Sequence, residues 1–282
     1  MKKLMTTALL TATALTSAAH AEDSVEVLHW WTSGGEAAAV SVLKDALEAQ
    51  GVTWNDMPVA GGSGENAMTT VRSRVTAGNP PTSVQMLGFD ILEWAEQGEL
   101  SNLNATAEAE GWDNVVPEAL QFFAKYDGNW VSAPVNVHST NWIWASGVIM
   151  EELGVTEPPA DFAGLLDLAR RAQEAGYIGI AHGGQPWQDA QVFDSVAIAT
   201  GGLDWYKRVF IDLDPEAINS DTMIEVLDNV GEYRALVDEN FSGRDWNLAT
   251  AMVINDQAAF QLMGDWAKGE FVNAGEVAGE DF

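Results

Sequence analysis

The chain has 282 residues, of which 42 are acidic and 13 basic, so its formal net charge is −29, and it contains no cysteine. Binding to nucleic acid or to an anionic membrane surface needs basic residues, so the charge argues against both kinds of partner. Without cysteine, a disulfide framework, a thiolate nucleophile and a cysteine-ligated metal are excluded. Since 47% of the residues are hydrophobic, the acidity is typical of a folded protein's surface rather than of a disordered chain.

The first 21 residues have the pattern of a secretory signal peptide. A basic start at Lys2 and Lys3 precedes an apolar run of small residues, and Ala19 and Ala21 supply the side chains that a signal peptidase reads. We therefore expect cleavage before Glu22 and export to the periplasm. A lipoprotein would need a cysteine at that point, so no lipid anchor is expected.

Strands and helices alternate in the first part of the exported chain. Residues 25–31 contain β-branched side chains with a period of two, and residues 36–50 place apolar side chains on one helical face. The same reading predicts strands at 52–59 and 84–87 and helices at 67–77 and 89–96. This order implies an open, mainly parallel sheet with right-handed crossovers.

From residue 148 onward the pattern becomes mostly helical. Helices are predicted at 148–153, 162–175, 188–199, 222–237 and 246–260. An extended stretch at 130–146 separates the two patterns. We therefore expect an α/β fold with a signal peptide at 1–21, an N-terminal α/β lobe at 22–135 and a second, more helical lobe at 136–282.

Motifs along the whole exported chain resemble one family. The segment His29-Trp30-Trp31-Thr32-Ser33-Gly34-Gly35-Glu36 is similar to the start of bacterial ABC-transporter sugar-binding proteins, in the glucose/mannose-binding group of extracellular solute-binding protein family 1. Further matches are 79–82, 134–142, 187–190, 243–247 and 263–269. The resemblance implies a two-lobed periplasmic-binding-protein fold of type II and a bound monosaccharide, glucose or a related hexose. It also implies an ABC permease in the inner membrane as partner, no cofactor, no metal and a monomer.

Aromatic residues at the end of the first strand are candidate sugar ligands. A pyranose has apolar C–H faces and a polar rim, so its site needs flat rings beside hydrogen-bonding groups. Trp30 and Trp31 lie where open α/β sheets place ligands, and adjacent strand residues point in opposite directions. We expect one ring in the cleft and the other beneath it. Glu36 either accepts sugar hydroxyls or is an acidic residue favoured in the first helical turn.

The second part of the chain adds candidates through the resemblance. Trp246 and Trp266 are each expected either in the cleft or in the core, and His138 is either a hydroxyl partner or a structural histidine. Asp265 and Lys268 flank Trp266, and they either bind hydroxyls or pair with each other at the helical i,i+3 spacing.

Two features depart from the family pattern. Leu87 stands where relatives often carry a hydrogen-bonding residue, so the preferred sugar is expected to differ. The sequence ends at Phe282, whereas family members run further. A C-terminally truncated chain with weak affinity is therefore expected.

The alternative function is that of a secreted glycoside hydrolase, which would also be acidic and rich in tryptophan and would need two carboxylates facing a cleft. The sequence contains no Gly-x-Ser-x-Gly, His-Glu-x-x-His or phosphate-loop motif. Its four histidines are too scattered to propose a metal site. The prediction is therefore a binding protein and not an enzyme.

Overall fold

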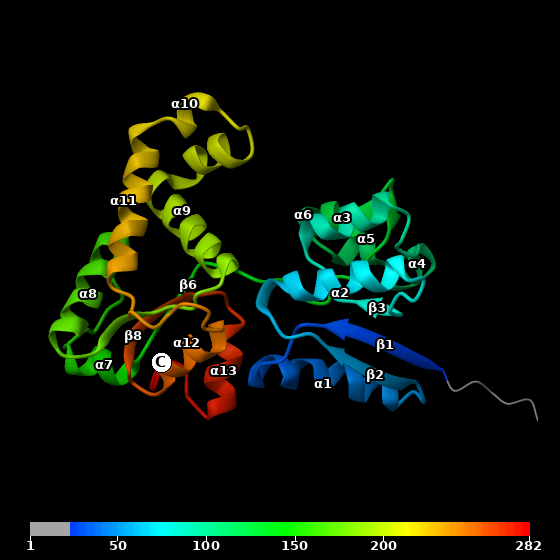
Figure 1. Ribbon diagram of the computed structural model, residues 1–282, viewed down its shortest axis with the longest axis horizontal. Helices are drawn as coiled ribbons and strands as arrows, with labels where there is room; N and C mark the ends of the chain where they lie inside the picture. Colours follow the sequence, from blue (N-terminus) through cyan, green and yellow to red (C-terminus); the bar gives the residue numbers. More distant parts are fainter. Residues whose placement is uncertain (1–22) are drawn as a thin grey trace, which may run out of the picture.

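The protein is described by a computed structural model over residues 23–282, so the predicted signal peptide and its cleavage site before Glu22 lie outside the described residues. Two lobes, each with its own sheet and helices, lie side by side (Figure 1). The predicted two-lobed α/β architecture is confirmed. Within residues 23–282, no helix combines the length and the apolar character that crossing a bilayer requires.

The first lobe is built on a parallel three-stranded sheet of order β2-β1-β3. Its strands are β1 (Ser24–His29), β2 (Thr53–Pro58) and β3 (Ser83–Val84). The helices that follow these strands are α1 (Gly34–Glu48), α2 (Glu65–Thr76, after the short 3-10 turn Gly62–Gly64) and α3 (Gly88–Glu96). This is the predicted β-α-β-α-β-α order, and the third strand is shorter than predicted. The lobe continues with α4 (Asn104–Glu110), α5 (Trp112–Val115), α6 (Glu118–Ala124) and the hairpin of β4 (Lys125–Tyr126) and β5 (Asn129–Trp130).

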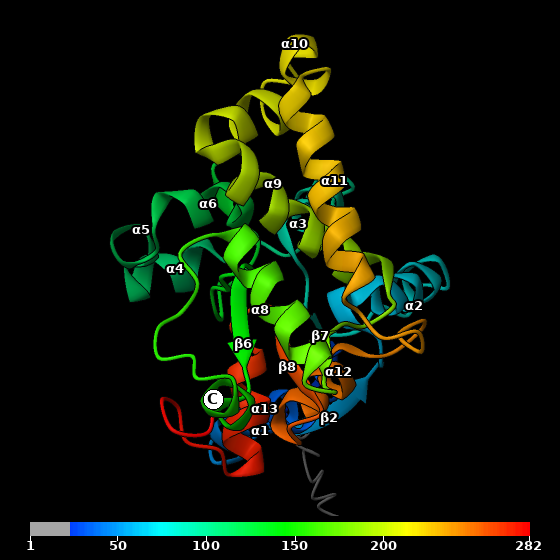
Figure 2. The same cartoon turned by 90° about the vertical axis from the view of Figure 1, so that its left-hand side faces the viewer.

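The second lobe has a mixed sheet of order β6-β8-β7. Strand β8 (Ala258–Met263) lies in the middle, antiparallel to β6 (Trp142–Ala145) and parallel to β7 (Ile178–Ala181). The helices are α7 (Gly147–Glu152), α8 (Phe162–Glu174), α9 (Pro186–Phe210), α10 (Pro215–Ile218), α11 (Asp221–Ala235), α12 (Trp246–Ile254) and α13 (Ala267–Ala274). In Figure 2, α9, α10 and α11 form an arm that projects from this sheet.

The helix predicted at 246–260 is wrong. Helix α12 ends at Ile254, and residues 258–263 form the central strand β8. All six side chains of β8 are buried. A strand covered on both faces shows no polar alternation, and a short apolar run of this kind cannot be told from a buried helix by its period. The predicted helix at 188–199 is part of the longer α9, whose helical geometry is interrupted at Gly202.

The two lobes are joined by an extended chain between β5 and β6, here called the crossing segment (residues 131–141). It has no regular secondary structure, and nearly all of its side chains are exposed from residue 133 onward. In Figure 1 this segment runs across the gap between the lobes. It therefore faces the space in which the predicted site residues meet.

Candidate ligand-binding site

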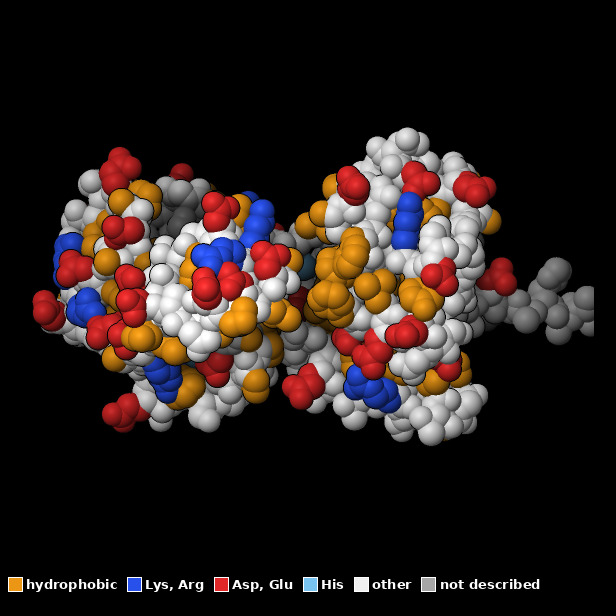
Figure 3. Space-filling view, turned by 90° about the horizontal axis from the view of Figure 1, so that it is seen from above, with side chains coloured by type: hydrophobic (Ala, Val, Ile, Leu, Met, Phe, Trp, Pro, Cys, Tyr) orange, Lys and Arg blue, Asp and Glu red, His pale blue; other side chains and the backbone are white. Residues whose placement is uncertain are grey.

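A cleft of about 1250 Å³ lies between the lobes. The first lobe contributes the end of β1 and the start of α1, the second lobe contributes the start of α9 together with tryptophans near α12 and α13, and the crossing segment forms part of the wall. Figure 3 shows the molecule hollowed between its two halves. The cleft is thus lined by chain segments that are more than two hundred residues apart in sequence.

The paired tryptophans after β1 differ in their surroundings. Trp30 is 6% exposed and packs in a core with Leu28 and Trp94. A Cβ atom on Gly64 would lie 2.7 Å from the Trp30 ring, so that ring is seated directly on the backbone of the neighbouring turn. Trp31 is only partly buried and packs against the same core. Both line the cleft, with Trp30 as the ring beneath and Trp31 as the more accessible one.

Glu36 takes part in capping helix α1. Its Oε2 atom accepts the backbone N–H groups of Thr32 and Ser33, each at 3.1 Å, while Ser33 Oγ accepts the N–H of Glu36 at 3.4 Å. This reciprocal capping box satisfies donors that a helix start leaves unpaired. Burial raises the pKa of Glu36, partly offset by the bonds from Ser33 and Thr32. Glu36 also lines the cleft, and its role as a sugar acceptor stays a prediction.

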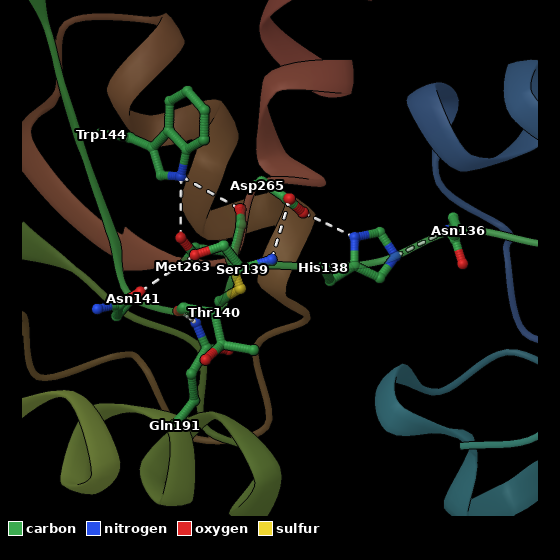
Figure 4. Close-up of polar contacts among 10 residues, drawn as sticks. Asn136, His138, Ser139, Thr140, Asn141, Trp144, Gln191, Met263 and Asp265 are labelled. Carbon is green, nitrogen blue, oxygen red and sulfur yellow. Dashed lines mark hydrogen bonds and ion pairs between the residues drawn. The ribbon is translucent and has the colours of Figure 1, made fainter. Parts of the chain in front are cut away.

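Asp265 is bonded to the crossing segment rather than to Lys268. Its Oδ1 accepts from Nδ1 of His138 at 2.7 Å, and its Oδ2 accepts the backbone N–H of Ser139 at 3.0 Å (Figure 4). The N–H of Asp265 donates in return to the carbonyl of Ser139 at 2.9 Å. Among the described residues no ion pair joins Asp265 and Lys268, and Lys268 is exposed and does not line the cleft.

His138 is oriented by two partners. Because Asp265 accepts from its Nδ1, its Nε2 is the acceptor for the side-chain amide of Asn136 at 2.9 Å. The ring also meets Trp266 edge-on, with centroids 5.1 Å apart. His138, Asn136 and Asp265 all line the cleft, so this network forms part of its wall.

Three tryptophans of the second lobe meet in the cleft. The Trp266 ring lies 6.2 Å from the Trp187 ring and 6.5 Å from the Trp246 ring. Trp246 is 5% exposed and belongs to the core of the lobe, whereas Trp187 and Trp266 are partly buried. The more accessible rings, Trp187 and Trp266, are therefore the ones best placed to stack on a ligand.

Two polar residues on α9 line the cleft and were missed by the sequence reasoning. Gln191 is buried, and its Nε2 donates to the Thr140 carbonyl at 2.5 Å, which ties α9 to the crossing segment. Asp194 lies one turn further along and is exposed. The signal that could have found them is polar side chains at i,i+3 spacing just after the matched motif at 187–190. Over residues 23–282, no group of His, Asp and Glu side chains is arranged to hold a metal ion.

The chain is similar to known proteins over its described length. The family model for bacterial extracellular solute-binding proteins matches residues 30–282. A probable sugar-binding periplasmic protein of Rhizobium meliloti is 58% identical, with 100% of this chain and 68% of the relative covered, and a protein of the same name from Brucella melitensis is 58% identical, with 98% and 65% covered. A chitin oligosaccharide binding protein has the same fold, with a TM-score of 0.74 at 16% identity over 92% of this chain and 65% of that one. The chain thus spans about two thirds of the length of the proteins it matches, and it belongs to the bacterial extracellular solute-binding protein family.

Proposed function

We propose that the protein is a periplasmic sugar-binding protein, which captures a monosaccharide between its lobes and delivers it to an ABC permease of the inner membrane. The observation that carries the proposal is the aromatic lining of the cleft from both lobes. Trp31 comes from the first lobe, and Trp187 and Trp266 come from the second. Flat rings match the C–H faces of a pyranose, and the names of the two relatives from Rhizobium meliloti and Brucella melitensis agree with a sugar ligand.

Glucose or a related hexose is the proposed ligand, in keeping with the motifs at 29–36 and 263–269. A longer sugar is the second candidate, because the cleft volume of about 1250 Å³ exceeds the roughly 300–1,000 Å³ usual for small-molecule pockets. The fold shared with a chitin oligosaccharide binding protein is compatible with that alternative. Leu87, which lines the cleft and is 45% exposed, offers no hydrogen bond to a hydroxyl.

The proposed mechanism is closure of the lobes about the crossing segment. A ligand that contacts both lobes only when they are closed binds the closed form more tightly, so it shifts the balance between the open and closed forms. The enzyme alternative is disfavoured by the family and by the geometry of two predicted site carboxylates. The Oε2 atom of Glu36 is used in helix capping, and both oxygens of Asp265 bond to His138 and Ser139.

A thermal-shift screen tests the proposal. Hexoses, pentoses, disaccharides and chitin oligosaccharides would be added separately at saturating concentration, because a ligand at 100 times its Kd stabilises the native state by about 2.7 kcal/mol. We expect a hexose to raise Tm and to change the tryptophan fluorescence. A shift with oligosaccharides alone would support the second candidate. Hydrolysis of aryl glycosides, abolished by replacing one carboxylate pair, would refute the binding-protein assignment.

A further inference from the structure

The N-terminus of helix α1 in the first lobe contacts helix α13 in the second. The backbone N–H of Gly35 donates to Oε1 of Glu270 at 2.7 Å, across 235 positions of sequence. Figures 1 and 2 both place α1 beside α13. The first N–H groups of a helix have no partner within the helix, and its dipole favours a negative charge at this end. A carboxylate of one lobe therefore caps a helix of the other.

The two helices approach so closely that a side chain would not fit between them. A Cβ atom on Gly35 would lie 2.6 Å from the carbonyl carbon and 2.9 Å from the carbonyl oxygen of Gly269. Both are backbone atoms, so they cannot move aside as the end of a side chain can. Gly35 lies inside α1 and has no positive φ. Because glycine is less favourable than alanine inside a helix, its presence here is explained by the contact and not by the backbone conformation.

A second contact between the lobes has the same character. Gly62, in the turn before α2, faces the side chain of Trp187 at the start of α9, and a Cβ atom on Gly62 would lie 2.6 Å from that indole ring. Gly62 and Trp187 both line the cleft. Glycines of the first lobe thus lie directly against the second lobe at two places.

We propose that the contact of Gly35 with Gly269 and Glu270 is a closure latch, which stabilises the closed arrangement of the lobes through contacts between groups of the chain. Gly35 and Gly269 line the cleft, whereas Glu270 does not. The latch itself consists of contacts between groups of the chain, so it does not depend on which ligand binds. Only its effect on affinity rests on the proposed function. Glu270 is accordingly a positioning residue. When only the closed form binds, the apparent Kd equals the intrinsic Kd divided by the closed fraction. Weakening the latch raises Kd by the factor by which the closed fraction falls.

The latch can be tested by distance measurements between spin labels. The chain has no cysteine, so Ser73→Cys on α2 and Glu174→Cys on α8 give one labelled pair, with one exposed position in each lobe. Double electron–electron resonance then reports the distribution of inter-lobe distances without any ligand. Glu270→Ala removes the acceptor, Glu270→Gln keeps an oxygen but removes the charge, and Gly35→Ala inserts a methyl group between the backbones.

Matched controls are available on helix α11. A Cβ atom on Gly231 meets nothing within 4 Å, and Glu225 is exposed. Gly231→Ala and Glu225→Ala should therefore leave the distances unchanged. We expect Glu270→Ala and Gly35→Ala to reduce the population of molecules at the inter-lobe distance of the unsubstituted chain and to populate a second distance. Glu270→Gln should reduce that population by an intermediate amount.

Calorimetry with D-glucose measures the consequence for binding. We expect the Kd for glucose to rise by the same factor by which each Glu270 variant lowers the closed fraction, because Glu270 does not line the cleft. If glucose does not bind but the distances shift, the latch stands and the proposed sugar is wrong. Unchanged distances in Glu270→Ala would overturn the latch, whether or not Gly35→Ala folds, because Glu270→Ala removes one hydrogen bond and disturbs no buried apolar core.

Discussion

Replacing Trp31 by alanine should weaken sugar binding more than it lowers stability. The ring lines the cleft and is only partly buried, so its main contribution is a stacking surface for the ligand. Stacking on aromatic rings is worth about 1–3 kcal/mol for the flat rings of nucleobases, and we take that range for a sugar face. At 1.4 kcal/mol for each tenfold change, Trp31→Ala should raise Kd roughly 5- to 150-fold.

The neighbouring substitution should have the opposite balance. Trp30 is 6% exposed, and its backbone N–H donates to Oε1 of Gln85 at 3.2 Å. Truncating a buried tryptophan costs about 3–5 kcal/mol of unfolding free energy. Trp30→Ala should therefore lower the urea midpoint of the protein. Any loss of affinity should follow from the unfolding of the first lobe, which circular dichroism would detect.

The control is a tryptophan outside the cleft. Trp142 is 49% exposed, stacks on Trp144 with centroids 5.6 Å apart, and does not line the cleft. Trp142→Ala should leave Kd unchanged in calorimetry with the sugar selected by the thermal-shift screen. If Trp31→Ala binds that sugar as tightly as the unsubstituted protein does, the assignment of Trp31 to the ligand surface is refuted.

Three further substitutions test the interactions that shape the second lobe. Asp265→Ala removes the acceptor of the His138 ring and of the Ser139 N–H, so urea unfolding should show a loss of about 1.5–3 kcal/mol in the free energy of unfolding. An unchanged free energy of unfolding would contradict the inference that Asp265 holds the crossing segment. Burial lowers the pKa of His182, so the stability due to its neutral ring is present above pH 6.5 and is lost as the pH falls through its folded pKa. Between pH 7.5 and 5 the unfolding free energy of His182→Gln should therefore fall less than that of the unsubstituted protein. Equal falls in the two proteins would refute this. Hydrogen bonds from Arg244 lower the pKa of Asp238, so Asp238→Asn should lower the free energy of unfolding by about 1.5–3 kcal/mol at pH 7. This loss should shrink as the pH falls below 3.8, where Asp238 of the unsubstituted protein becomes protonated. A loss that does not depend on pH would exclude the ion pair as its cause.

The first lobe could be predicted from local patterns because its structure is local. The strand at the N-terminus alternates in polarity, and Ser33 and Glu36 have the spacing of a capping box, which fixes the start of α1. Strands joined by single helices then indicate an open parallel sheet with right-handed crossovers, although the order β2-β1-β3 comes from the structure. The third strand, Ser83–Val84, is short because only two residues pair with β1.

The sheet of the second lobe could not be predicted in this way. Its central strand β8 pairs with β6, more than a hundred residues earlier in the chain. Such pairing leaves no local signature, and the burial of both faces of β8 removes the period-two signal. The predicted helix at 246–260 was wrong for this reason, although α12 does occupy its first nine residues.

In the candidate site, sequence motifs predicted which residues line the cleft but not which partners they bond. The motif at 263–269 identified Asp265 and Trp266, and both line the cleft. The partner of Asp265 could not be inferred, because the i,i+3 spacing indicated Lys268 whereas the carboxylate bonds His138, 127 positions earlier. Family motifs thus located the residues of the cleft wall, and the tertiary fold decided which of their polar atoms are already engaged.

Three residues with separate roles lie in the short segment 265–270, so they move as one unit. Asp265 holds the crossing segment, Trp266 faces the cleft, and Glu270 caps α1 of the other lobe. In the first lobe, Trp31 lies only four residues before Gly35, with the α1 cap between them. If the lobes close as proposed, the backbone contact of Gly35 with Gly269 limits how near the two segments that carry Trp31 and Trp266 can approach each other. A methyl group at Gly35 would widen the cleft at that contact.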